Sequence, residues 1–66
     1  MVMFITKRRS KKNGKLYTAI VAQQVCDDNT TKEVYVTFDR LAISKIARLC
    51  GVNLSSLKEG EELIIV

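Results

Sequence analysis

Histidine is absent from this chain of 66 residues, and only two cysteines, Cys26 and Cys50, are present. Two cysteines without histidine have neither a metal-ligand spacing nor a disulfide framework. A cysteine without histidine also lacks the base that activates a catalytic thiol. The acidic residues have no base, metal cluster or phosphate loop to act with them. We therefore expect a protein that is not an enzyme and that takes no metal, cofactor or small-molecule substrate.

Long apolar runs are missing as well. No stretch approaches the roughly 18 residues that a membrane span requires, and the apolar start MVMFI precedes the first charges, the reverse of a secretory signal. The two cysteines are interpreted as buried, reduced thiols, which are typical of the cytoplasm. The sequence thus predicts a cytoplasmic protein without a membrane partner.

The small size of the chain limits its hydrophobic core. Residues 1–66 form one predicted domain, and a domain of this length buries only about 60% of its unfolded surface. Without a disulfide or a metal, such domains often gain further burial by self-association. We expect a homodimer or a higher homo-oligomer, with contacts through unpaired sheet edges and the apolar end from Leu63 to Val66.

Acidic residues are missing from the first twenty positions, and this is where the positive charge is concentrated. Residues 1–20 carry six positive and no negative charges, whereas residues 21–66 carry five positive and seven negative charges. This asymmetry indicates a basic hairpin, over residues 7–20, on a nearly neutral body. The six cations are Lys7, Arg8, Arg9, Lys11, Lys12 and Lys15.

Asn13-Gly14 lies within the basic stretch and is the strongest short signal for a two-residue type I′ turn, in which both residues take positive φ. Such a turn sets Lys12 opposite Lys15. Directly opposed like charges destabilise a strand pair. Because a polyanion would relieve this repulsion, the pattern favours nucleic acid as the partner.

Strand patterns cover much of the rest of the chain. Apolar and β-branched residues predict strands over residues 1–12, 16–26, 34–38 and 61–66, with a turn at 27–32. In the strand 34–38, strict alternation puts Val34, Val36 and Phe38 on one face and Tyr35 on the other.

A helix of about three turns is predicted between the last two strands. Asp39 is a good N-cap, and Gly51 is the natural residue just beyond the helix end. The expected buried stripe of this helix is Leu41, Ala42, Ile46, Leu49 and Cys50. The order β-β-β-α-β defines a mainly β fold with one short helix, built as a small barrel or as a twisted antiparallel sheet.

Tyr17 and Tyr35 are the aromatic candidates for binding. Tyr17 lies in the basic hairpin, and Tyr35 lies on the polar face of its strand. A base stacked on such a ring contributes about 1–3 kcal/mol with little sequence preference. Alternatively, a tyrosine can pack half buried with its hydroxyl in water. For Phe4 and Phe38 we expect a core position.

Two segments carry a family resemblance. The stretch Lys12-Asn13-Gly14-Lys15-Leu16-Tyr17-Thr18 resembles the basic hairpin of small phage single-stranded DNA-binding proteins. The stretch Leu57-Lys58-Glu59-Gly60-Glu61-Glu62-Leu63 resembles the turn into the last strand of the oligonucleotide-binding (OB) barrel. The resemblance implies an OB-like barrel, sequence-tolerant single-strand binding and self-association, with Lys12, Lys15 and Tyr17 in the binding hairpin.

These features predict sequence-tolerant binding of single-stranded DNA or RNA. Two alternatives remain open. The first is a regulator of duplex DNA, acting through a β-ribbon or through a helix-turn-helix at 43–57, where Ala47 and Gly51 have the spacing of the turn. The second is a protein-interaction module whose hairpin binds an acidic partner. The expected nucleic-acid-binding residues are Lys7, Arg8, Arg9, Lys11, Lys12, Lys15, Tyr17 and Tyr35.

Overall fold

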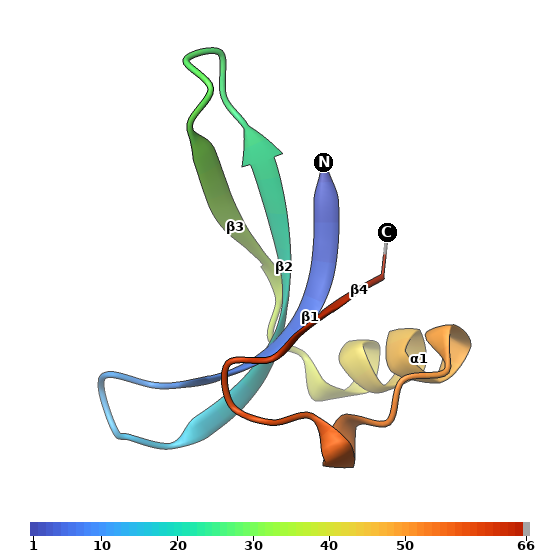
Figure 1. The fold of residues 1–66 in the computed structure, drawn as a ribbon. Coiled ribbons are helices and arrows are strands. Elements are labelled where there is room, and N and C mark those ends of the chain that lie inside the picture. The colour runs from blue at the N-terminus through green and yellow to red at the C-terminus, as the bar shows by residue number, and fades with distance from the viewer. Residues whose placement is uncertain (66) are drawn as a thin grey trace.

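The computed structural model describes residues 1–65, and these form a four-stranded antiparallel sheet with one helix (Figure 1). The predicted order β-β-β-α-β and the mainly β fold class are confirmed. The sheet has the order β3-β2-β1-β4, so that β3 and β4 are its edges and it stays open rather than closing into a barrel. The elements are β1 (Val2–Arg9), β2 (Leu16–Val25), β3 (Thr31–Thr37), α1 (Arg40–Cys50), a 3-10 turn (Leu54–Ser56) and β4 (Glu62–Ile64).

Several strand boundaries differ from the expected ones, and β1 ends at Arg9, three residues before the expected end of the first strand. β3 begins at Thr31, inside the expected turn 27–32, because Asn29 takes a left-handed conformation and the chain reverses early. The Cys26 N–H donates to the Thr30 carbonyl at 2.7 Å and closes this turn. In the expected strand 61–66, β4 covers Glu62–Ile64, and Val66 lies outside the described residues.

The β1–β2 hairpin turns through a longer loop than expected. Arg9 pairs with Leu16 and Arg8 pairs with Tyr17, which displaces the register by two residues from the predicted one. Gly14 has φ 70°, whereas Asn13 keeps a negative φ, and the Asn13 side-chain carbonyl accepts the Lys15 N–H at 2.9 Å. The prediction of a two-residue type I′ turn is therefore wrong.

The consequence of this loop concerns the lysines. Ser10 and Lys15 close the loop through a backbone hydrogen bond of 2.8 Å, and Lys11 and Lys12 lie within it. Lys12 is therefore not opposed to Lys15 in a ladder. The directly opposed like charges that the sequence predicts are absent from the hairpin. An anionic partner is therefore inferred from the charges that the surface exposes.

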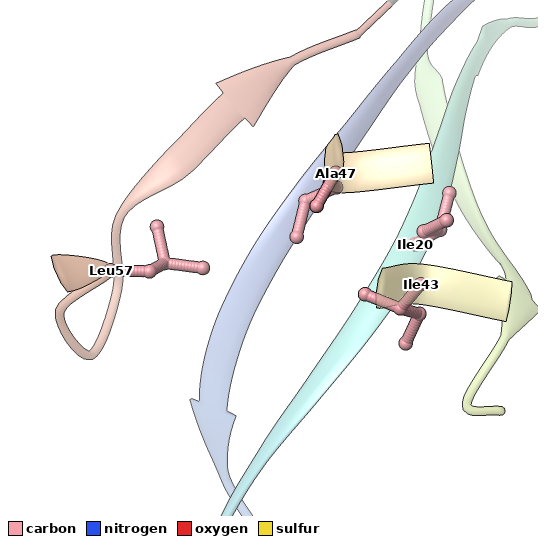
Figure 2. Packing of buried hydrophobic residues seen from close by; sticks show 5 residues of the cluster. Ile20, Ile43, Ala47 and Leu57 are labelled. Carbon is pink, nitrogen blue, oxygen red and sulfur yellow. The ribbon is translucent and has the colours of Figure 1, made fainter. Parts of the chain in front are cut away.

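One face of the sheet packs against α1. The buried cluster joins the sheet residues Ile5 and Ile20 to Ile43 and Ala47 of α1 and to Leu57 of the connector (Figure 2). Burial of each isoleucine or leucine contributes about 1.5–3 kcal/mol to stability. This cluster fixes α1 against β1 and β2, and with it the start of the helix at the end of β3.

The buried stripe of α1 differs from the expected one. Ile43 and Ala47 are buried and Ile46 is partly buried, a spacing of three and four residues along one helical face. Leu41 and Leu49 are 78% and 87% exposed, so their assignment to the core is wrong. The expected caps are confirmed: the Asp39 carboxylate accepts the Leu41 N–H at 3.0 Å, and Gly51 has φ 73°.

The other face carries a second, smaller core. Phe4, Ala19 and Val21 are buried there, with Tyr17 packed against them, so the expected core position of Phe4 is confirmed. The cysteines are both free, but Cys50 is exposed and Cys26 is only half-buried. Their assignment as buried thiols is therefore wrong: Cys26 lies just beyond the end of β2, and Cys50 is the last residue of α1.

The segment after Gly51 does not form a second helix. It contains one 3-10 turn, Leu54–Ser56, whose N-cap Asn53 accepts the Ser55 N–H at 3.1 Å, and a turn at residues 59–60 then leads into β4. The expected helix-turn-helix at 43–57 thus lacks the recognition helix that would enter a groove of DNA. The only α-helix in residues 1–65 is too short to cross a membrane.

Candidate nucleic-acid interface

A bulge in β3 brings two aromatic side chains to the same face. Ile20 pairs with Thr37 and Val21 pairs with Tyr35, which leaves Val36 as an extra residue. Strict alternation places Tyr35 and Phe38 on opposite faces, but the extra residue reverses this relationship. Their rings stack with centroids 5.0 Å apart and planes inclined by 27°. Phe38 is 55% exposed, so its expected core position is wrong.

Tyr17 of β2 completes an aromatic cluster, defined here as Tyr17, Tyr35 and Phe38. The Tyr17 ring lies 5.8 Å from the Phe38 ring, and the hydroxyl oxygens of Tyr17 and Tyr35 are 3.3 Å apart. The inner side of Tyr17 packs against the second core, whereas Tyr35 and Phe38 are exposed. Tyr17 therefore anchors the cluster to the core, and Tyr35 and Phe38 provide aromatic surface that is open to solvent.

Arg8 holds this cluster in place through its contacts with both edge strands. Its guanidinium donates to the two carboxylate oxygens of Glu33 at 3.0 and 3.2 Å and to the Tyr35 hydroxyl at 2.9 Å. A further contact of 3.7 Å reaches Glu62 of β4. The hydrogen bonds to Glu33 and Tyr35 raise the pKa of Arg8 above its usual range. The charge that the sequence assigned to phosphate binding is thus already balanced by carboxylates.

The hydrogen bonds of the tyrosine hydroxyls also shift the pKa values of Tyr17 and Tyr35 in opposite directions. The hydrogen bond between the Tyr17 and Tyr35 hydroxyls raises the pKa of Tyr17. The same bond, together with the one donated by Arg8, lowers the pKa of Tyr35, since both stabilise its phenolate. Tyr35 is therefore the more acidic hydroxyl of the pair.

Arg9 braces the hairpin loop. Its guanidinium donates to Glu59 at 2.9 and 3.3 Å and to the carbonyl of Gly14. Lys11, Lys12 and Lys15 are exposed around the same loop, and within residues 1–65 none of them forms an ion pair. The loop thus presents three lysine charges that no carboxylate neutralises.

An open groove of about 850 Å³ lies between the loop and the aromatic cluster, and we call it the hairpin groove. Lys11, Lys15 and the three rings all line this groove, and no carboxylate is among its lining residues. Phe38 is a member that the sequence did not indicate. The expected site residues that line this groove are Arg8, Arg9, Lys11, Lys15, Tyr17 and Tyr35.

Two expected site residues lie outside the hairpin groove. Lys12 is exposed in the loop, and Lys7 projects to the face of the sheet that carries α1, where it lines separate grooves with Arg40. Successive residues of a strand point to opposite faces, so a run of cations along β1 is divided between the two sides.

Comparisons with models of protein families, with curated proteins and with solved structures found no match. The geometry of the hairpin groove is therefore the basis on which a function is inferred.

Proposed function

We propose that this protein binds single-stranded DNA or RNA with little sequence preference, in the hairpin groove. The observation that carries the proposal is the position of three aromatic rings beside lysines that have no carboxylate partner. Lysines that neutralise phosphates release counterions, which drives association with any nucleic acid. Exposed rings accept any base by stacking. The two groups are complementary to the two parts of a single-stranded chain.

The residues of the groove and of the adjoining loop take different roles in this proposal. Lys11, Lys12 and Lys15 contact phosphates, and Tyr35 and Phe38 stack on bases. Arg8 and Arg9 position the rings and the loop, because their guanidinium groups are already bound to carboxylates. Bases in a duplex are stacked on one another, so a stacking surface favours single strands over duplex DNA.

We also propose that the protein acts in the cytoplasm as a homodimer or higher homo-oligomer. The outer edge of β3 carries no neighbouring strand in the described chain, and its residues Val34 and Val36 are 45% and 50% exposed. An exposed strand edge of this kind pairs readily with another strand.

Binding isotherms against oligo-dT, oligo-U and duplex DNA at several salt concentrations test the proposed function. We expect both single-stranded oligomers to bind more tightly than the duplex. With three lysines on phosphate, the hairpin groove and its loop should together contribute about −2 to the log–log salt slope, at roughly −0.7 per phosphate.

A double variant, Lys11→Ala with Lys15→Ala, should weaken binding to all sequences alike and make the slope less steep by about 1.4. Lys45→Ala with Lys58→Ala removes the same charge outside the groove and should bind like the wild type. Equal affinities of the two double variants would refute the hairpin groove as the site. A preference for one duplex sequence would instead support the alternative function, a regulator that binds duplex DNA.

A further inference from the structure

Part of β2 has a neighbouring strand on the β1 side only. β3 pairs with β2 only from Ile20 to Val25, so within the described chain the segment from Leu16 to Ala19 has a free edge on that side. Figure 1 shows the hairpin extending beyond the end of β3, where the chain leaves the sheet and enters α1. A bound chain can therefore pass from one face of the sheet to the other around this edge.

Three further grooves follow one another from this edge to α1. The first shares Leu16, Tyr17 and Phe38 with the hairpin groove and adds Lys7 and Arg40. The next also contains Lys7 and Arg40 and extends to Ser44 and Ser55. The last shares Ser44 and Ser55 and reaches Arg48. Each groove shares lining residues with the one before it, so the three lie next to one another along the surface, and together we call them the helix track.

The helix track has the electrostatic character of the hairpin groove. Lys7, Arg40 and Arg48 line it, and no carboxylate does, although the chain contains seven acidic residues. In the described part of the chain, none of these three cations forms an ion pair. Asp39 precedes Arg40 but does not line the track, and its carboxylate accepts the Leu41 N–H at the helix cap. The track is thus a second run of cations with no carboxylate partner.

We propose that a bound single strand continues from the hairpin groove across the free edge of β2 into the helix track, where Lys7, Arg40 and Arg48 contact further phosphates. This inference rests on the proposed function and extends it to a second group of residues. Lys7 belongs to the run that the sequence singled out, whereas Arg40 and Arg48 lie more than twenty residues away in sequence. The site is therefore longer than the hairpin and includes one face of α1.

Binding of oligo-dT of increasing length, at several salt concentrations, tests this extension. The variant is Arg40→Gln with Arg48→Gln, and the matched control is Lys45→Gln with Lys58→Gln, which removes equal charge outside the track. Oligomers that fill only the hairpin groove should bind all three proteins alike. Longer oligomers should bind the track variant about 25-fold more weakly at 0.1 M salt, with a slope less steep by about 1.4, because two phosphate contacts are lost.

Circular dichroism should show that both variants are folded, and Lys7→Gln provides a second test that leaves α1 unchanged. Equal binding of long oligomers to variant and control would overturn the track while leaving the hairpin groove intact. Failure of the wild type to bind any oligomer would overturn the proposed function itself. Binding of poly-glutamate but not of oligonucleotides, with the same dependence on Arg40 and Arg48, would assign the track to an acidic protein and also overturn the proposal.

Discussion

The Arg8 guanidinium on β1 donates hydrogen bonds to both carboxylate oxygens of Glu33 on β3, reaching across the intervening strand β2. The nitrogen that binds one of these oxygens also donates to the Tyr35 hydroxyl. Two-pronged pairs between arginine and carboxylate fix geometry as well as charge. The pair therefore couples the edge strand β3 to the centre of the sheet and sets the position of the ring beside it.

The first prediction concerns this ion pair. We expect Arg8→Gln and Glu33→Gln to show a favourable coupling of about 0.2–1 kcal/mol in a double-mutant cycle, because the two side chains are 27% and 38% exposed and solvent screens the pair. Urea denaturation of the wild type, both single variants and the double variant measures this coupling. Asp27→Asn, in an exposed turn, should change stability by less than about 0.5 kcal/mol. Additive effects of the two substitutions would show that the pair does not stabilise the sheet.

The second prediction concerns Phe38. Phe38→Ala should weaken binding of oligo-dT by about 1–3 kcal/mol through loss of stacking. The salt slope should stay the same, since stacking releases no counterions. Leu49→Ala is the matched control, because Leu49 is an exposed apolar residue that lines neither the hairpin groove nor the helix track. An affinity equal to that of the control would remove Phe38 from the site.

Local signals in the sequence were sufficient to predict the order of the strands and the helix. Asp39 and Gly51 mark the ends of α1 because capping depends on the residues next to the cap. Alternation of apolar residues located β3 within three residues at its start. The hairpin loop was predicted at the right place but with the wrong length, because Asn13 uses its side chain rather than a positive φ to stabilise the turn.

The composition of the site depended on contacts between distant residues. The bulge at Val36 arises where β3 pairs with β2, and no residue type in the strand marks it. Without the bulge, Tyr35 and Phe38 cannot be recognised as neighbours. The pairing of Arg8 with Glu33 joins residues that are 25 positions apart, so the sequence alone presents Arg8 as one more free cation.

The third prediction concerns the two tyrosine hydroxyls. We expect tyrosinate absorbance to rise in two steps, one below and one above the usual pKa of about 10, with Tyr35 contributing mainly to the first. Tyr17→Phe removes the partner hydroxyl and should move the pKa of Tyr35 back towards its usual value. A single step near pH 10 for both groups of the wild type would contradict the network.

The same pair makes stability depend on pH, and the sign follows from proton binding. Below about pH 10 the unfolded chain keeps the Tyr35 proton longer than the folded protein does, so the contribution of Tyr35 to stability rises with pH. Above about pH 10 the folded protein keeps the Tyr17 proton longer, so the contribution of Tyr17 falls with pH. The combined contribution should be greatest near pH 10, and urea denaturation of the wild type and Tyr17→Phe at several pH values measures it.

The last prediction concerns self-association through β3. This edge strand has seven residues, of which six are exposed, whereas the opposite edge β4 has three. Antiparallel pairing of two copies about Val34 places Lys32 opposite Val36 of the second copy and Glu33 opposite Tyr35, so no like charges face each other. A two-fold axis makes such an interface self-complementary.

Sedimentation at micromolar concentration should therefore give twice the 7.5 kDa of one chain or more. Val34→Lys should yield a monomer, because a charge at the centre of the paired edges blocks strand addition. Ile64→Lys adds the same charge to β4, where Ile64 is 73% exposed, and should leave the dimer intact. A monomeric wild type would refute self-association, and dissociation by Ile64→Lys alone would place the interface at β4, because only the edge that carries the contact is sensitive to the added lysine.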